Sequence, residues 1–166
     1  MYEFTSSEDI AALRSRDAAF SMLDGHAAER YAEIRTDGRY RAPVVKSYVI
    51  ETVPKRQQGQ LTMEQLLRGS GLCTQQFDDM IFRVGDETFG KWLGILERVS
   101  PRFLVLHTTE KVHYTDDIVH KALAASPYLD NMWVAGLYFD RLWGSVCQSA
   151  PNNAWIRMKF ESENRY

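Results

Sequence analysis

The chain has 166 residues, a length typical of one domain, and a domain of this size buries roughly two-thirds of the surface that its unfolded form exposes. Its composition, 45% hydrophobic and 25% charged, excludes an intrinsically disordered chain. A formal net charge of -2 excludes a general attraction to nucleic acids or acidic membranes, so any such attraction must be local. The two cysteines, Cys73 and Cys147, form no CxxC pair, which excludes a cysteine-rich zinc site.

The amino terminus, MYEFTSSEDI, has neither the basic nor the apolar segment of a signal peptide. No apolar run approaches the roughly 18 residues that a membrane span needs. We therefore expect a cytoplasmic protein without a membrane partner.

The amino-terminal part is predicted to be helical. A helix over 5–23 has Ser6 or Ser7 as its cap, and the Asp-Gly pair at 24–25 interrupts the pattern. Helical spacing resumes over 26–35 and ends at the next Asp-Gly pair.

The next elements are shorter. Residues 44–53 are rich in β-branched side chains and lie between two prolines, which predicts a strand. Residues 61–71 predict a short helix, because Thr62 and Gln65 have the spacing of a capping box. Residues 75–84 fit a helix and a strand equally well.

The apolar residues of 86–99 fall on one helical face, which predicts a helix that carries Gly90 and Gly94 four residues apart. Four further elements are expected: a buried strand at 102–107, a helix at 115–126 capped by Thr115, a helix or strand beginning at residue 132, and a half-buried strand at 154–162.

Because helices and strands alternate, the predicted class is α/β or α+β. We expect a single small domain over 1–166, with a mixed sheet flanked by helices. It would combine a helical part at 6–36 with a mixed α/β part at 40–162. The chain is either a small complete domain or the front end of a longer protein.

Residues 107–120 contain three of the four histidines. A helix that starts at Thr115 leaves His113 outside it, and no HExxH motif is present, so we expect no metal. His107 and His113 each begin an H-x-T sequence of the kind that two-histidine phosphoesterases use for acid and base. On one extended strand these histidines would lie about 20 Å apart, and only a turn would bring them together. The simpler interpretation is a strand end, a turn and a helix start.

Residues 30–56 hold seven basic residues with tyrosines among them. The candidate phosphate contacts are Arg39, Arg41, Lys46, Lys55 and Arg56. The alternative interpretation is that these basic residues form a solvated strand face and loop. Residues 61–84 also follow a generic helix-turn-helix pattern, although Asp78 and Asp79 in the second helix would repel DNA.

The strand at 154–162 places Trp155 on its polar face beside Arg157 and Lys159, which makes these three the candidate interface residues. The favoured function is a non-catalytic binding, assembly or regulatory module acting through contacts with a protein partner or a second copy, without a cofactor. The alternatives are a nucleic-acid-binding module and a small phosphoesterase or metal-dependent hydrolase that uses His107 and His113.

Overall fold

The structure is a computed structural model that describes residues 7–37, 44–53 and 61–132, together with residues 141, 144, 145 and 148. The chain divides into two compact units, Met1–Met132 and Trp133–Tyr166. Every helix and strand whose bounds are described lies in the first unit. The predicted strand at 154–162 lies outside the described residues, as does nearly all of the element predicted from residue 132.

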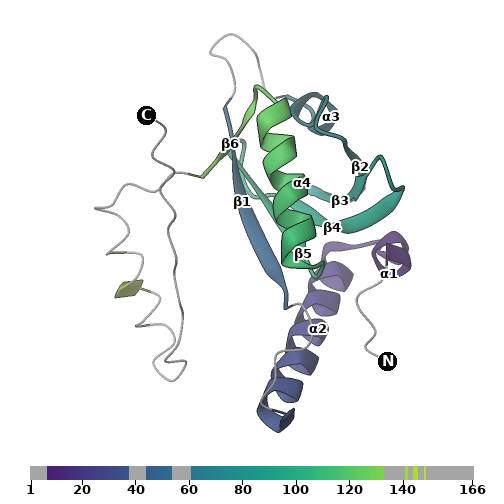
Figure 1. The fold of residues 1–166 in the computed structure, drawn as a ribbon, viewed down its shortest axis with the longest axis vertical. Helices are drawn as coiled ribbons and strands as arrows, with labels where there is room; N and C mark the ends of the chain where they lie inside the picture. The colour runs from purple at the N-terminus through teal and green to yellow at the C-terminus, as the bar shows by residue number, and fades with distance from the viewer. Residues whose placement is uncertain are drawn as a thin grey trace. The chain divides into compact units, whose positions relative to one another are not determined.

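In chain order the elements are α1 (Ser7–Ala12), α2 (Arg16–Asp37), β1 (Lys46–Thr52), α3 (Met63–Leu66), β2 (Leu72–Asp78), β3 (Ile81–Asp86), β4 (Lys91–Arg98), β5 (Phe103–Thr108), α4 (Val112–Ala125) and β6 (Leu129–Asn131) (Figure 1). The six strands form one sheet in the order β2-β3-β4-β5-β1-β6. The α+β class is confirmed. Instead of the mixed sheet expected, every described pairing is antiparallel.

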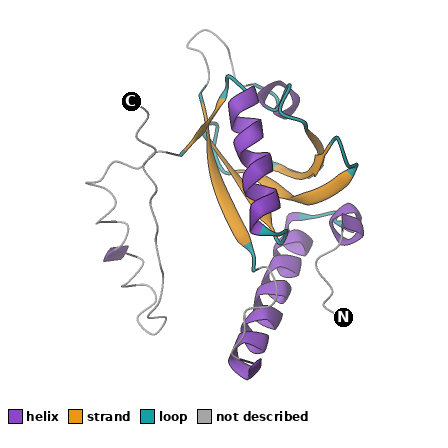
Figure 2. Ribbon diagram, viewed as in Figure 1, coloured by secondary structure: helices purple, strands orange, loops and turns teal. Residues whose placement is uncertain are grey.

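Helices cover both faces of the sheet (Figure 2). On one face α4 packs through Val119 and Leu123 onto the α4-side core, which includes Leu96, Leu104 and Leu106 of the sheet. On the other face α1 and the first half of α2 bury the α2-side core: Ile10, Leu13, Ala19, Leu23, Ile81 and Ile95. The sheet therefore separates two apolar layers, and its strands contribute side chains to both.

The predicted interruption at 24–25 is wrong, because α2 continues through Asp24 and Gly25. The break lies earlier, between α1 and α2, where Leu13 is buried and the Oγ of Ser15 accepts a hydrogen bond from the backbone N–H of Ala18 at 3.2 Å. This serine caps α2. A glycine within a helix costs only about 1 kcal/mol relative to alanine, so Gly25 does not end α2.

The helix predicted at 86–99 is also wrong, since this segment forms a turn followed by β4. Residues 93–96 are buried one after another, because β4 lies inside the sheet with a helical layer on each face. A strand buried on both faces has a continuous apolar run, which periodicity cannot distinguish from a helix.

The helix-turn-helix interpretation of 61–84 is overturned. The first helix, α3, has the predicted capping box of Thr62 and Gln65, but it spans only four residues. The segment after it forms the antiparallel hairpin of β2 and β3, with Met80 at a φ of 55° in the turn. No second helix is therefore present to enter a DNA groove.

Candidate functional site

Ser47 of β1 and His107 of β5 are directly opposite each other in the antiparallel register. Their side chains lie on the sheet face that α2 partly covers, and the Oγ of Ser47 is 2.8 Å from the Nδ1 of His107. The ring of Phe20 meets the imidazole edge-on, with 5.4 Å between the centroids. The pairing of β1 with β5 therefore aligns a serine and a histidine, and Ser47 is exposed.

Glu97 of β4 extends this alignment to a third strand. Its Oε2 lies 3.8 Å from the Nε2 of His107, and Arg16 of α2 bonds its Oε1 at 2.9 Å. The Nε2 of His107 is buried and has no hydrogen-bond partner among the described residues. We call this arrangement the Ser47–His107–Glu97 line.

Burial lowers the pKa of His107, Glu97 opposes that shift, and Arg16 adds to it. Because burial is the largest effect, the imidazole favours its neutral form. A neutral imidazole has one nitrogen that accepts and one that donates a hydrogen bond. Nδ1 can therefore accept the Ser47 proton while the N–H of Nε2 points toward Glu97.

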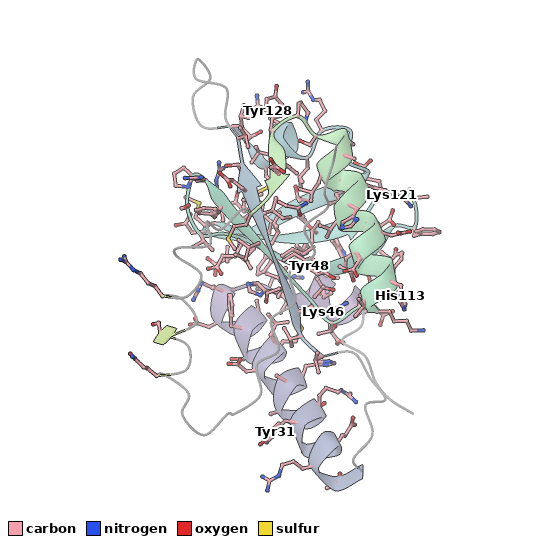
Figure 3. All side chains as sticks on the ribbon, turned by 60° about the vertical axis from the view of Figure 1, so that its left-hand side comes forward. Tyr31, Lys46, Tyr48, His113, Lys121 and Tyr128 are labelled. Atoms are coloured by element: carbon pink, nitrogen blue, oxygen red, sulfur yellow. The ribbon has the colours of Figure 1, made fainter. Side chains whose placement is uncertain are left out.

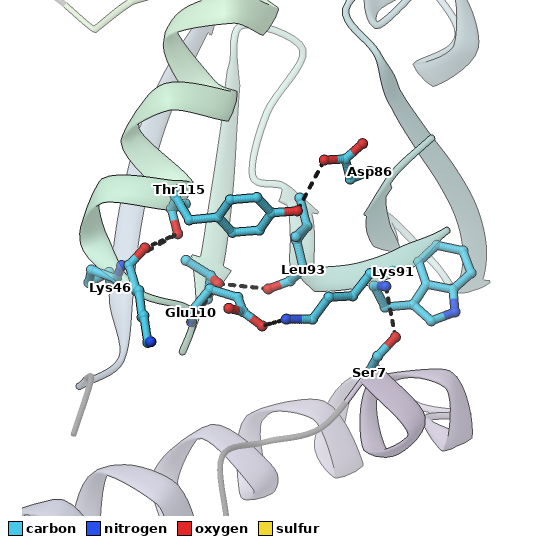
Figure 4. A network of polar contacts seen from close by, with 11 residues as sticks. Ser7, Lys46, Asp86, Lys91, Leu93, Glu110 and Thr115 are labelled. Atoms are coloured by element: carbon cyan, nitrogen blue, oxygen red, sulfur yellow. Dashed lines mark hydrogen bonds and ion pairs between the residues drawn. The ribbon is translucent and has the colours of Figure 1, made fainter. Parts of the chain in front are cut away.

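A second polar group, the α4 polar network, lies on the other face, where α4 begins (Figure 4). Lys91 pairs with Glu110, and the hydroxyl of Tyr114 donates to Asp86 at 3.0 Å. Burial, followed by the hydrogen bond to Asp86, raises the pKa of Tyr114 to about 12.

Near the start of β1 the same network continues. Tyr48 donates to Asp116, and Lys46 donates to the Oγ1 of Thr115 at 3.4 Å. Burial lowers the pKa of Lys46 against the opposing charges of Asp116 and Glu110. Each of these side chains has a partner within the protein, so the network attaches α4 to the sheet.

The two histidines proposed from the H-x-T sequences are not brought together. His107 lies on the α2 side of the sheet, where it contacts Phe20. His113 is exposed on α4, which covers the opposite face (Figure 3). The helix α4 begins three residues earlier than predicted, and Thr115 lies inside it, where its Oγ1 donates to Lys111 O. No described group of three or more histidine, cysteine, aspartate or glutamate side chains could hold a metal ion.

Of the five candidate phosphate contacts, only Lys46 lies among the described residues, and its side chain is directed at the α4 polar network (Figure 3). The other four candidates lie outside the described residues: Arg39, Arg41, Lys55 and Arg56. The interface candidates Trp155, Arg157 and Lys159 also lie outside the described residues. In the same basic stretch Arg30 is buried and pairs with Glu33 at 2.6 Å.

Sequence reasoning missed Ser47 and Glu97. Ser47 lies in a correctly predicted strand, but its partner depends on strand register, which local sequence does not encode. Glu97 was hidden in the segment assigned to a helix. Only the register of β1 against β5 places Ser47 and His107 on a common face.

β2 is one edge of the sheet, and it offers a third surface. The six residues from Leu72 to Phe77, LCTQQF, carry no charge. Gly71 O accepts from the N–H of Glu87 on the β3 side, and backbone direction alternates along a strand. The N–H and C=O groups of Leu72, Thr74 and Gln76 therefore point away from the sheet.

These features define an α+β protein with an antiparallel sheet between two helical layers. The chain belongs to the family of the MJECL33-like protein, whose family model matches residues 7–145. No match was found among curated proteins or among solved structures. Within the described part of the chain, no helix is both long and apolar enough to cross a membrane.

Proposed function

We propose that this protein is an assembly module that pairs with a second copy of itself through the outer edge of β2. The uncharged edge LCTQQF carries the proposal. Proteins usually protect edge strands with lysine, proline or a covering element, because unpaired N–H and C=O groups accept another strand. From Leu72 to Phe77 neither lysine nor proline is present, and no described strand pairs with the outer side. The N–H of Leu72 donates to the Oγ of Ser70 at 3.2 Å, so the outward groups offered to a partner strand are those of Thr74 and Gln76.

A second copy is the occupant that the symmetry of an edge strand favours. When a strand pairs antiparallel with its own copy, residue i meets residue j and residue j meets residue i, which is the geometry of a twofold dimer. The uncharged side chains meet without repulsion between like charges. The bulge between Gln76 and Asp78 limits regular pairing to the first part of β2.

The test is the molar mass of the full chain by sedimentation or by light scattering after gel filtration. We expect a dimer of twice the 19.2 kDa chain mass. Thr74→Pro removes an outward N–H without removing a hydrogen bond to β3, so this variant is expected to be a folded monomer. Lys111→Pro, at the exposed start of α4 where φ is already −61°, is the control for introducing a proline away from the edge.

A charge exchange keeps the test independent of proline strain. Thr74→Lys and Thr74→Glu place like charges near the dimer axis, so each variant is expected to be monomeric by itself and to pair with the other when mixed. A wild-type chain that stays monomeric up to its solubility limit contradicts the proposal. Wild-type dimers that survive all three substitutions also contradict it, because they use another surface.

A further inference from the structure

We propose that the Ser47–His107–Glu97 line is a nucleophilic serine site that cleaves carboxylic esters. This activity goes beyond assembly and stands on separate residues. Three neighbouring strands supply the nucleophile, the base and the group that positions the base, in the order β1, β5 and β4.

The nucleophile and the base already have the required geometry. The distance from Ser47 Oγ to His107 Nδ1 is 2.8 Å, within the range for proton transfer from a nucleophile to its base. The sheet register holds this pair in place, so neither partner has to be ordered when substrate arrives.

Glu97 acts as a positioning residue. Its Oε2 is 3.8 Å from Nε2, longer than a hydrogen bond, and catalytic hydrogen bonds in ligand-free enzymes are commonly long and shorten with substrate. Arg16 bonds the other carboxylate oxygen and holds the side chain beside the imidazole. A buried Nε2 without another described partner leaves Glu97 as the acceptor for its proton.

The backbone N–H of Ser47 is the candidate oxyanion donor. The N–H of Thr52 bonds Arg102 O on the β5 side, and the N–H of Val53 bonds Tyr128 O on the other side. By alternation the N–H of Ser47 also points away from β5, and β6 pairs with β1 only from Ile50 to Thr52. The nucleophile's own N–H is therefore not bonded to a described strand, and it can donate to a developing oxyanion.

The chemical step balances within this group. Ser47 Oγ attacks the ester carbonyl carbon and forms a C–O bond, while its proton moves to His107 Nδ1. The alcohol leaves with that proton when the original ester bond breaks. Water then gives a proton to Nδ1 and attacks the acyl-serine, and Ser47 leaves with the proton, so the products are a carboxylic acid and an alcohol.

The surroundings favour an apolar acyl group. Val49 lies two residues from Ser47 on the same face and is 36% exposed, and Val105 of β5 is opposite it in the register. The ring of Phe20 also contacts the imidazole, in an edge-on arrangement. The acyl group would lie on this surface.

The experiment treats the full chain with a fluorophosphonate. In this reaction Ser47 Oγ bonds to phosphorus, fluoride leaves, and the serine proton passes to His107. Mass spectrometry is expected to find one adduct, on Ser47, and Ser47→Ala is expected to lose it. Ser21→Ala, on the exposed surface of α2, is the control and should label like the wild type. Circular dichroism and a thermal melt establish that each variant folds.

His107→Gln should slow labelling by about 100-fold or more, since a positioned general base contributes about 10²–10⁴-fold. Glu97→Gln should move the inflection of the labelling rate to lower pH, because Glu97 raises the pKa of His107. Absence of a wild-type adduct, or an adduct on another serine, overturns the proposal. Labelling of Ser47 that is unchanged in His107→Gln overturns it as well.

Discussion

At the residue scale, Gly94 shows how closely β4 approaches β5. A Cβ at this position would lie 2.2 Å from the carbonyl oxygen of His107, so the backbone must move to accept alanine. We expect Gly94→Ala to lower the free energy of unfolding by about 3 kcal/mol, at the upper end of overpacking in a core. Gly25→Ala is the matched control, because nothing lies within 4 Å of its Cβ and alanine favours a helix, so we expect a gain of about 0.5–1 kcal/mol. Urea denaturation measures the free energy of unfolding of both variants. Equal changes in the two variants would contradict the close contact between β4 and β5 at Gly94.

His107 gives a second prediction at this scale. Burial lowers its pKa in the folded chain, whereas the unfolded chain titrates near the ordinary value of about 6.5. The unfolded state therefore binds the proton first as the pH falls, and the free energy of unfolding decreases from about pH 6.5 down to the folded pKa. His107→Gln should flatten this part of the curve, whereas His113→Gln, on the exposed side of α4, should follow the wild type. Urea denaturation at a series of pH values measures the slopes, and parallel curves for His107→Gln and wild type would refute the assignment.

At the element scale, the two halves of α2 differ in what they contact. Ala19 is fully buried against the α2-side core, and Ala28 is exposed farther along the same helix. Leucine at position 19 must push α2 away from Ile81 and Ile95, so we expect Ala19→Leu to cost about 1–3 kcal/mol. Ala28→Leu introduces the same side chain at an exposed position, where only helix propensity changes. We expect it to change the free energy of unfolding by less than about 0.5 kcal/mol. Thermal and urea unfolding compare them, and similar losses in both variants would show that α2 does not pack as described.

The elements that were predicted correctly are those whose signals are local. The capping box of Thr62 and Gln65 and the β-branched run of β1 depend only on neighbouring residues, and both were found from sequence. β4 was assigned to a helix because its burial on both faces comes from the tertiary arrangement. The Ser47–His107–Glu97 line was missed for the same reason, since strand pairing brings His107 beside Ser47, 60 positions away, and beside Glu97, ten positions away.

At the scale of the whole molecule, the strands link the two cores within the unit Met1–Met132. β4 places Ile95 in the α2-side core and Leu96 in the α4-side core, so neither layer of helices can separate without exposing a face of the same strand. We therefore expect the two faces to unfold together.

Leu104→Ala tests this coupling. Leu104 is fully buried on the α4 side, and its truncation is expected to lower the free energy of unfolding by about 2–5 kcal/mol. In hydrogen exchange, the slowest amides of the sheet report global unfolding, and we expect the amides of α2 to lose as much protection as those of α4. Ile95→Val on the α2 side should have the converse effect, with a smaller loss of about 0.5–1.5 kcal/mol that spreads equally to α4. A loss of protection confined to the mutated face would mean that the two helical layers are separate cooperative units, and the sheet would then join them without coupling their stability.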